Sequence, residues 1–191
     1  MRYLMPLAAI ILAGCAQAPT SNSQIANYET KGNLQSNAPL SCVALASVTN
    51  KHTPADIYPG VAKCVTSGSY DKAAQLFALA GVYGRFDMLR VSDSTARQAI
   101  QVLQLNNFYS FTDTQREAFK KTMGTYLSPD SKEFLNLCAQ IKAKGAPNYH
   151  PSYMIQHGMG AFSGNSGNGI KSDFDAAKGW QESLNGYLHC P

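Results

Sequence analysis

Charged side chains recur every two to four residues directly after the most apolar stretch of the chain. They are Arg85, Asp87, Arg90, Asp93 and Arg97. On helical backbone, side chains three or four residues apart are neighbours, so each acid in this string can pair with an arginine. Partly buried members must pair, because desolvation of a charge costs several kcal/mol. The string predicts an ion-pair lattice that fixes the turn after the apolar stretch. The sharper alternative is an arginine that binds a carboxylate or phosphate of a ligand.

Aromatic, histidine and methionine side chains crowd into residues 148–162, which is unusual for a surface loop. His150, Met154 and His157 would share one face of a continuous helix, and two imidazoles with a thioether suit copper. Pro151 argues against such a metal site, because a proline that opens a helix leaves His150 at the cap.

Two further interpretations of residues 148–162 stay open. In the first, the segment packs into the core, and Gly158 and Gly160 admit the backbone of a neighbouring element. In the second, its aromatic rings form a recognition surface. The candidate binding residues are Tyr149, His150, Tyr153 and His157 from this segment, with Arg85, Asp87, Arg90 and Asp93 from the charged string.

Signatures of catalysis are largely absent from the sequence. The chain has four histidines, and its acidic residues mostly fall at predicted helix starts, where the helix dipole explains them. Residues 164–167, Gly-Asn-Ser-Gly, resemble a serine-hydrolase elbow but lack the flanking strand that such an elbow needs. The sequence also lacks a phosphate-binding loop, a dinucleotide fingerprint and a zinc motif. We therefore predict no catalytic residue, metal or cofactor.

The N-terminus carries a targeting signal. A basic residue precedes an apolar run, residues 4–12, which ends in Leu12-Ala13-Gly14-Cys15. These residues resemble the lipobox of bacterial lipoproteins, and the run is too short to span a membrane. The resemblance implies that residues 1–14 are a signal peptide and that Cys15 is acylated after cleavage. With Ala16 in place of aspartate, it also implies anchoring in the outer membrane, with the protein facing the periplasm.

The charge balance excludes one class of partner. The whole sequence has 16 basic and 12 acidic side chains, a formal net charge of +4. Cleavage of the signal peptide removes Arg2, which leaves 15 basic against 12 acidic side chains, a net charge of +3. These basic residues are scattered along the chain, so we expect no binding to nucleic acid.

Four cysteines remain once Cys15 is assigned to the lipid. They are Cys42, Cys64, Cys138 and Cys190. An even number in the oxidising periplasm indicates two disulfides, with three possible pairings. A zinc site is disfavoured because the closely spaced cysteine pairs of such sites are missing. We favour Cys42–Cys64 and Cys138–Cys190, since each bond would join a chain end to a helix near it in sequence.

Helices must position these residues, because no window alternates apolar and polar side chains as a strand does. Residues 70–91 contain the most apolar stretch, and no side chain from Leu76 to Tyr83 is charged. A helix that is apolar on all sides packs on several sides, so we expect the central helix here, stopped or bent by Gly84. We expect leucine in place of Ala78 or Gly81 to overpack its neighbours.

Start and stop signals divide the remaining chain into further helices. We expect these helices to begin at Thr53-Pro54, at Ser92 or Asp93, at Thr112 with a capping box to Gln115, at Ser128-Pro129, at Pro151 and at Ser172. The predicted fold class is all-α: a single compact domain of about six or seven short helices, packed as helical hairpins and stapled by two disulfides.

The predicted domain follows a polar tether. Residues 15–39, rich in Asn, Ser and Gln, cannot bury enough apolar surface to fold, so we predict a lipidated flexible tether and a helical domain at 40–191. Residues 70–80 resemble one helix of a tetratricopeptide-like repeat. No second copy follows at the repeat period, so the resemblance implies a packing style.

Together these features favour a non-enzymatic outer-membrane lipoprotein. The lipid on Cys15 would anchor the protein in the membrane. The helical domain would bind a protein partner in the periplasm, for example as an immunity protein against a toxin delivered there. One alternative is an envelope hydrolase that uses His150 or His157 with a nearby hydroxyl. A second is a carrier of a small ligand or metal that uses the charged string or residues 148–162.

Overall fold

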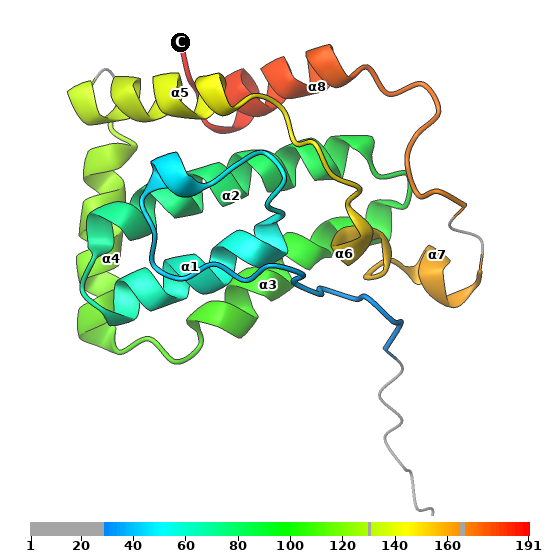
Figure 1. Ribbon diagram of the computed structural model, residues 1–191, viewed down its shortest axis with the longest axis horizontal. Helices are drawn as coiled ribbons and strands as arrows, with labels where there is room; N and C mark the ends of the chain where they lie inside the picture. The colour runs from blue at the N-terminus through cyan, green and yellow to red at the C-terminus, as the bar shows by residue number, and fades with distance from the viewer. Residues whose placement is uncertain (1–28, 130, 165–166) are drawn as a thin grey trace, which may run out of the picture.

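The computed structural model describes residues 29–129, 131–164 and 167–191, and its regular elements are helices (Figure 1). Within these residues the extended pairing is a single isolated bridge between Val91 and Ile170. The all-α prediction is confirmed. The elements are η1 (Leu45–Ser47), α1 (Pro54–Thr66), α2 (Tyr70–Arg90), η2 (Ser94–Gln98), α3 (Ala99–Phe108), α4 (Asp113–Tyr126), α5 (Lys132–Lys144), α6 (Ser152–Ile155), α7 (Met159–Phe162), α8 (Ala176–Glu182) and the π-helical turn η3 (Ser183–Tyr187).

Helices α1 and α2 form the hairpin around which the domain is built. Helix α1 begins at the predicted start, and the structure adds a capping box there: the Thr53 hydroxyl accepts a hydrogen bond from the Asp56 N–H, and the Asp56 carboxylate accepts one from the Thr53 N–H. Gly68, in the turn that follows α1, has a φ of 74°, a conformation that glycine adopts without steric cost. Along α2, residues 76–84 are buried apart from the half-buried Phe77. The predicted central helix is confirmed.

The central helix is longer than the sequence predicts. Gly84 neither stops nor bends it, and α2 continues to Arg90. A Cβ on Gly84 would lie 2.7 Å from Cδ1 of Ile100 in α3, so the missing side chain lets the two helices come close. Burial of α2 on several sides outweighs the cost of about 1 kcal/mol that glycine brings to a helix interior. Gly84 is therefore a packing position.

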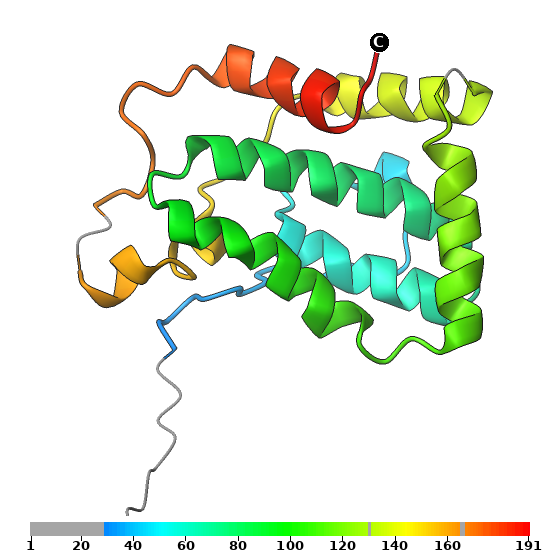
Figure 2. The ribbon, with the colours of Figure 1, turned by 180° about the vertical axis from the view of Figure 1, so that it is seen from behind.

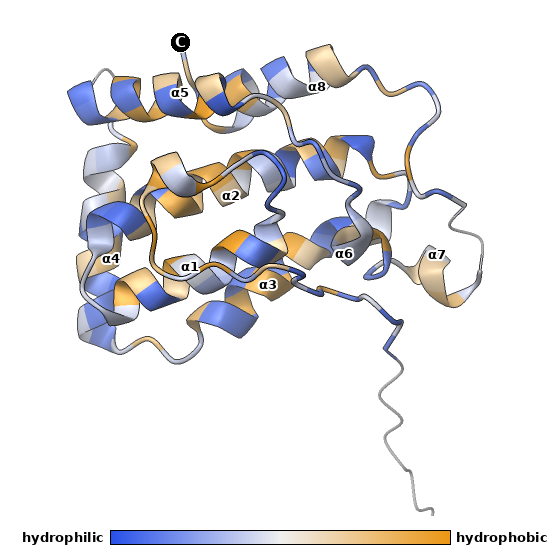
Figure 3. Cartoon of the chain, viewed as in Figure 1, coloured by the Kyte–Doolittle hydropathy of each residue, from blue (hydrophilic) through white to orange (hydrophobic). Residues whose placement is uncertain are grey.

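The helices are arranged around α2 in a simple way (Figures 1 and 2). Helices α1, α2 and α3 lie side by side, α5 and α8 run along the outer side of α2, and α4 crosses one end of this arrangement. Apolar and polar colours alternate around α1, α3 and α5 in Figure 3, whereas α4 is mostly pale or blue. No residue of α4 is buried. It is therefore a helix that lies on the core and does not enter it.

Two helix starts differ from the sequence prediction. Helix α5 begins at Lys132, because the Ser131 hydroxyl caps it by accepting from the Phe134 N–H, whereas Ser128 lies in the turn after α4. Helix α8 begins at Ala176, because Asp175 caps it by accepting from the Lys178 N–H; Ser172 lies outside the helix. In both cases several capping residues occur close together, and the position of the buried side chains selects one of them.

Both favoured disulfides are present in the structure. Cys42 is bonded to Cys64, and Cys138 to Cys190. The first ties the segment before η1 to α1. The second ties α5 to the C-terminal residues that follow η3, so the end of the chain is held against the fold.

The first described residues lie against the domain. Leu34 N–H donates to the Tyr153 carbonyl, and the Asp56 carboxylate accepts from the Ser36 hydroxyl and the N–H groups of Asn37 and Ala38. Residues 29–39, predicted as tether, are thus bonded to the helices, and the expected start at 40 is too late. Residues 1–28, with the predicted signal peptide and Cys15, lie outside the described residues. In the described part of the chain, no helix has the length and apolarity to cross a membrane.

Candidate functional site

Four of the eight predicted binding residues meet in one buried cluster. Asp87, on α2, is fully buried, and its Oδ2 accepts hydrogen bonds from the phenols of Tyr149 at 2.9 Å and Tyr153 at 2.7 Å. Its Oδ1 accepts from Nε of Arg90 at 2.9 Å. Nη2 of Arg90 lies 2.8 Å from the same oxygen as an ion-pair contact. The cluster joins α2 to α6 and to the segment before it.

The Asp87 carboxylate is satisfied by its three donors, whereas the buried Nη2 of Arg90 makes its ion-pair contact without a hydrogen bond. Burial raises the pKa of the Asp87 carboxyl, while the Arg90 guanidinium and the two phenol donors oppose the rise. The guanidinium also packs on the rings of Phe86 and Tyr149, at 5.0 and 5.1 Å from their centroids. The Arg90 side chain is 11% exposed. Because these groups enclose the Arg90 guanidinium, its N–H groups are not open to a ligand anion.

The rest of the charged string does not form the predicted lattice. Helix α2 ends at Arg90, so Asp93 leaves the helical register and caps η2 by accepting from the N–H of Thr95. Asp93 also accepts a 2.7 Å hydrogen bond from the Gly160 N–H. Among the described residues the ion pairs are Asp87–Arg90 and a more exposed Arg85–Glu182 pair. The string fixes the turn after α2, but mostly through hydrogen bonds to other segments.

The glycines of residues 148–162 do admit a neighbour, but it is a side chain. Where backbone was expected, the Asp93 carboxylate approaches both Gly158 and Gly160, and a Cβ on Gly158 would also lie 3.0 Å from Cβ of Ala96. The core interpretation holds for Tyr153 and Met154, which are buried. It fails for His150, which is exposed.

The two histidines of this segment hydrogen-bond to different partners and do not form a shared metal site. Nδ1 of His150 lies 2.9 Å from the Ser152 hydroxyl, and its Nε2 lies 2.8 Å from the Asn168 carbonyl. His157 bonds through Nδ1 to the amide oxygen of Asn33, and burial lowers its pKa. Across the described ranges, no group of three His, Cys, Asp or Glu side chains is placed to hold a metal ion.

Sequence reasoning missed a cluster of aromatic rings beneath α4. The Phe77 ring, on α2, lies 5.7 Å from Phe119 of α4 and 6.1 Å from Phe108 of α3, measured between centroids. Phe108 stacks on Phe111 at 5.1 Å. A signal for this cluster was available, because three aromatic residues, Phe108, Tyr109 and Phe111, stand directly before the capping box of α4.

The outer side of this cluster is open to solvent. It forms a shallow cavity of about 350 Å³ between α3 and α4, with phenylalanine rings and Met123 at its base and the cations Arg116 and Lys120 beside them. Beside it, Leu105 and Tyr109 of the α3 end are 61% and 79% exposed. We call this surface the α3–α4 aromatic face. It consists of Phe77, Leu105, Phe108, Tyr109, Phe111, Arg116, Phe119, Lys120 and Met123.

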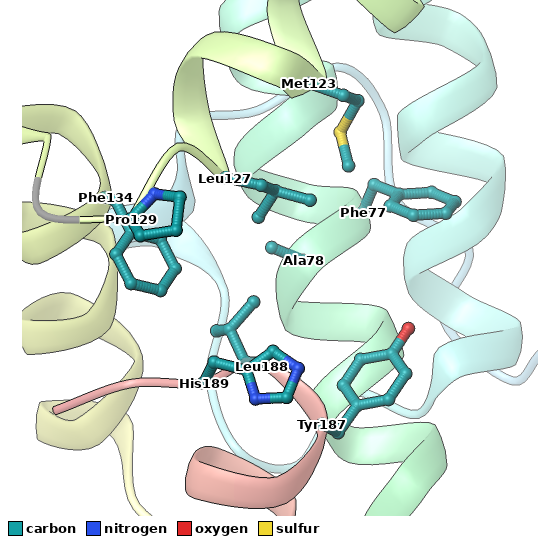
Figure 4. A pocket seen from close by; sticks show the side chains of 9 residues that line it. All are labelled: Phe77, Ala78, Met123, Leu127, Pro129, Phe134, Tyr187, Leu188 and His189. Carbon is teal, nitrogen blue, oxygen red and sulfur yellow. The ribbon is translucent and has the colours of Figure 1, made fainter.

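A second cavity lies on the other side of Phe77 and Met123 (Figure 4). It is more enclosed and has a volume of about 310 Å³. Side chains from α2, α4, α5 and the C-terminal segment line it: Phe77, Ala78, Met123, Leu127, Pro129, Phe134, Tyr187, Leu188 and His189. We call it the C-terminal cavity. Most of its wall is apolar, with the Tyr187 hydroxyl and the His189 imidazole as its polar side-chain groups.

Comparison of the chain with protein-family models, with curated proteins and with solved structures gives no match. The Asp87 cluster is enclosed, whereas the two apolar cavities beside α4 are accessible.

Proposed function

We propose that this chain is a non-enzymatic outer-membrane lipoprotein whose periplasmic domain binds a protein partner through the α3–α4 aromatic face. The observation that carries the proposal is the exposure of Tyr109, at 79%, beside a cavity floored by phenylalanine rings. Contiguous exposed apolar surface is uncommon on a monomer and marks interaction sites. Tyrosine and arginine are also the residues that most often dominate protein interfaces.

The charges at this face indicate the chemistry of the partner. Arg116 donates to the carbonyls of Phe108 and Tyr109, so its guanidinium is held at the edge of the cavity. Lys120 lies one turn further along α4 and also lines the cavity. Two cations beside an aromatic floor complement a segment that inserts an apolar side chain next to an acidic residue. An immunity protein that blocks a toxin delivered to the periplasm is one form of this function.

The proposal is tested by capture from solubilised envelopes with the wild-type protein and two variants. We expect Tyr109→Ala to weaken capture of a stoichiometric partner by about 30-fold, the effect of losing a hot-spot residue. The matched control is Met159→Ala on α7, which is 65% exposed and lies at the far end of the molecule from α4 (Figure 1). Equal capture by all three proteins, or no stoichiometric partner, would reject the aromatic face.

The lipid anchor has its own test. In a detergent phase-partition experiment, Cys15→Ser should move the protein from the detergent phase to the aqueous phase. The reason is that the thioether-linked lipid can no longer form. Mass spectrometry of the N-terminal peptide measures the acyl mass directly. An unmodified Cys15 in protein from native membranes would exclude the anchor.

A second candidate function, a hydrolase, is favoured by the pair His150 and Ser152. The Asn168 carbonyl can only accept a hydrogen bond, so in the neutral imidazole Nε2 carries the proton and Nδ1 can accept from the Ser152 hydroxyl. This is the arrangement of a serine activated by a base. The pair is exposed, and the described cavities are lined by other residues.

The hydrolase predicts covalent labelling of Ser152 by a fluorophosphonate probe. Labelling should be lost in Ser152→Ala and in His150→Ala, and kept in His52→Ala, a control histidine in a different turn. A wild-type protein that stays unlabelled removes this candidate and leaves the binding proposal intact.

A further inference from the structure

The size of the C-terminal cavity limits what it can hold. An apolar cavity of about 150 Å³ accommodates benzene, so the C-terminal cavity of about 310 Å³ has room for about twelve non-hydrogen atoms. This volume lies at the lower end of the range for small-molecule sites. It is too small for a peptide helix. It is a different cavity from that of the α3–α4 aromatic face, with which it shares the lining residues Phe77 and Met123.

The lining of this cavity is divided by chemistry. Phe77, Leu127 and Phe134 belong to its apolar wall, while Tyr187 and His189 bring polar groups from the C-terminal segment (Figure 4). A ligand that matches this division has a long apolar body and one polar end. Two side chains that can donate hydrogen bonds suit an oxygen-rich end such as a carboxylate.

The backbone that carries these polar groups is unusual at two points. Tyr187 ends a π-helical turn, a feature that recurs at functional sites. His189 has a φ of 61°, in the left-handed region that non-glycine residues rarely occupy. Such strain persists where the surrounding structure holds it, and it clusters at binding sites. Here the Cys138–Cys190 disulfide and the buried Leu188 hold the segment on both sides of His189.

The exposure of α4 gives ligands a route into the cavity. Met123 comes from this helix, which has no buried residue, and Leu127, the residue that follows it, is 37% exposed. Methionine is flexible and adapts to irregular apolar ligands. Small movements of these side chains would open the cavity without a change in the helices of the core.

We propose that the C-terminal cavity binds a medium-chain fatty acid, with the alkyl tail between Phe77, Ala78, Leu127 and Phe134 and the carboxylate at Tyr187 and His189. A chain of ten carbons with its carboxylate has about twelve non-hydrogen atoms, the number that the cavity volume allows. This inference does not rest on the proposed protein partner, which would bind at Tyr109 and Arg116, although the two sites share Phe77 and Met123.

Titration calorimetry with decanoate tests the proposal. Decanoate should bind with one-to-one stoichiometry, and hexanoate, four methylenes shorter, should bind about 200-fold more weakly. Hexadecanoate should bind more weakly than decanoate because its tail exceeds the cavity. Lack of decanoate binding by the wild-type protein would overturn the proposal.

Variants locate the site and its two ends. Ala78→Leu fills the tail region from α2 and should abolish decanoate binding. Leu127→Trp does the same from the partly exposed end of α4, where substitution spares the core. Leu135→Ala on α5 is the control, since Leu135 is 43% exposed and lies outside the lining. Decanoate binding that survives in both filled variants would place the site elsewhere and reject the cavity.

The polar end is tested by comparing decanoate with decanol. Tyr187→Phe keeps the ring, and His189→Gly keeps a residue that tolerates positive φ, so both preserve the backbone. Each should weaken decanoate binding by about tenfold while changing decanol binding little, because a hydrogen bond to a charged group is lost. Equal effects on the two ligands would reject the carboxylate assignment.

Discussion

The phenol of Tyr153 donates a 2.7 Å hydrogen bond to the carboxylate of Asp87, 66 residues earlier in the chain. This bond joins α6 to the end of the central helix in a region that excludes water. Tyr149 donates to the same carboxylate oxygen. The segment of aromatic and histidine residues and the charged string, which the sequence presents as two separate candidate sites, therefore meet as one structural cluster.

Removal of the Asp87 carboxylate should strongly destabilise the fold. In Asp87→Ala, Arg90 loses its ion pair and both phenols lose their acceptor, so we expect the free energy of unfolding to fall by about 3–5 kcal/mol. Tyr153→Phe removes one hydrogen bond and should cost about 1–3 kcal/mol. Urea denaturation measures both. Arg85→Ala is the control, since its more exposed pair with Glu182 should contribute less than about 1 kcal/mol; equal losses at Asp87 and Arg85 would contradict the cluster's role.

The two disulfides should contribute unequally to stability. Their sequence separations are 22 and 52 residues. In the chain-entropy model, these loops give about 3.4 kcal/mol for Cys42–Cys64 and about 4 kcal/mol for Cys138–Cys190. Paired alanine substitutions, compared by thermal denaturation, should show the larger loss for the second bond. Hydrogen exchange would also report greater opening of residues 183–191 in that variant, and unchanged exchange there would argue against the bond as their anchor.

Substitutions at Ala78 and Gly81, three residues apart on the same face of α2, should have different outcomes. The sequence predicts that leucine overpacks at both Ala78 and Gly81. In the structure Ala78 faces the C-terminal cavity, so Ala78→Leu should stabilise the fold or change its free energy by less than about 1 kcal/mol. A side chain at Gly81 would meet the ring of Tyr187, so Gly81→Leu should cost about 1–3 kcal/mol. Melting temperatures that fall equally in both variants would mean that Ala78 does not face a cavity.

Acid should release the N-terminal arm, residues 29–39, through protonation of Asp56. Burial raises the pKa of this carboxyl, but donors from Ala38, Ser36 and Thr53 together lower it below its ordinary value. Because the folded-state pKa is the lower one, Asp56 stabilises the fold at neutral pH, and this stabilisation is lost as the pH falls below about 4.

Hydrogen exchange of the arm against pH measures this effect. Protection of Asn37 and Ala38, whose N–H groups donate to Asp56, should decline below about pH 4. In Asp56→Asn the protection should already be low at neutral pH and should change little on acidification. A parallel decline in wild type and variant would assign the acid response to other groups.

Local sequence patterns predicted much of the architecture. Thr53 and Pro54 open α1 where the sequence predicted a helix start, and Thr112 opens α4 with the predicted capping box to Gln115. The run of small and apolar residues on α2 predicted a helix packed on several sides. These features could be inferred because capping and periodicity depend on residues within one or two turns of each other.

The sequence alone predicted an all-helical domain with a buried, small-residue central helix and two disulfides, Cys42–Cys64 and Cys138–Cys190. The tertiary structure decided the rest: that Asp87 faces Tyr149 and Tyr153, that residues 29–39 bind Asp56, and that α4 lies over two apolar cavities. The physical reason is the distance along the chain over which each feature is set. Helix formation and capping are set by neighbours in sequence, whereas the partner of a buried carboxylate and the space left beside a helix depend on how distant segments pack.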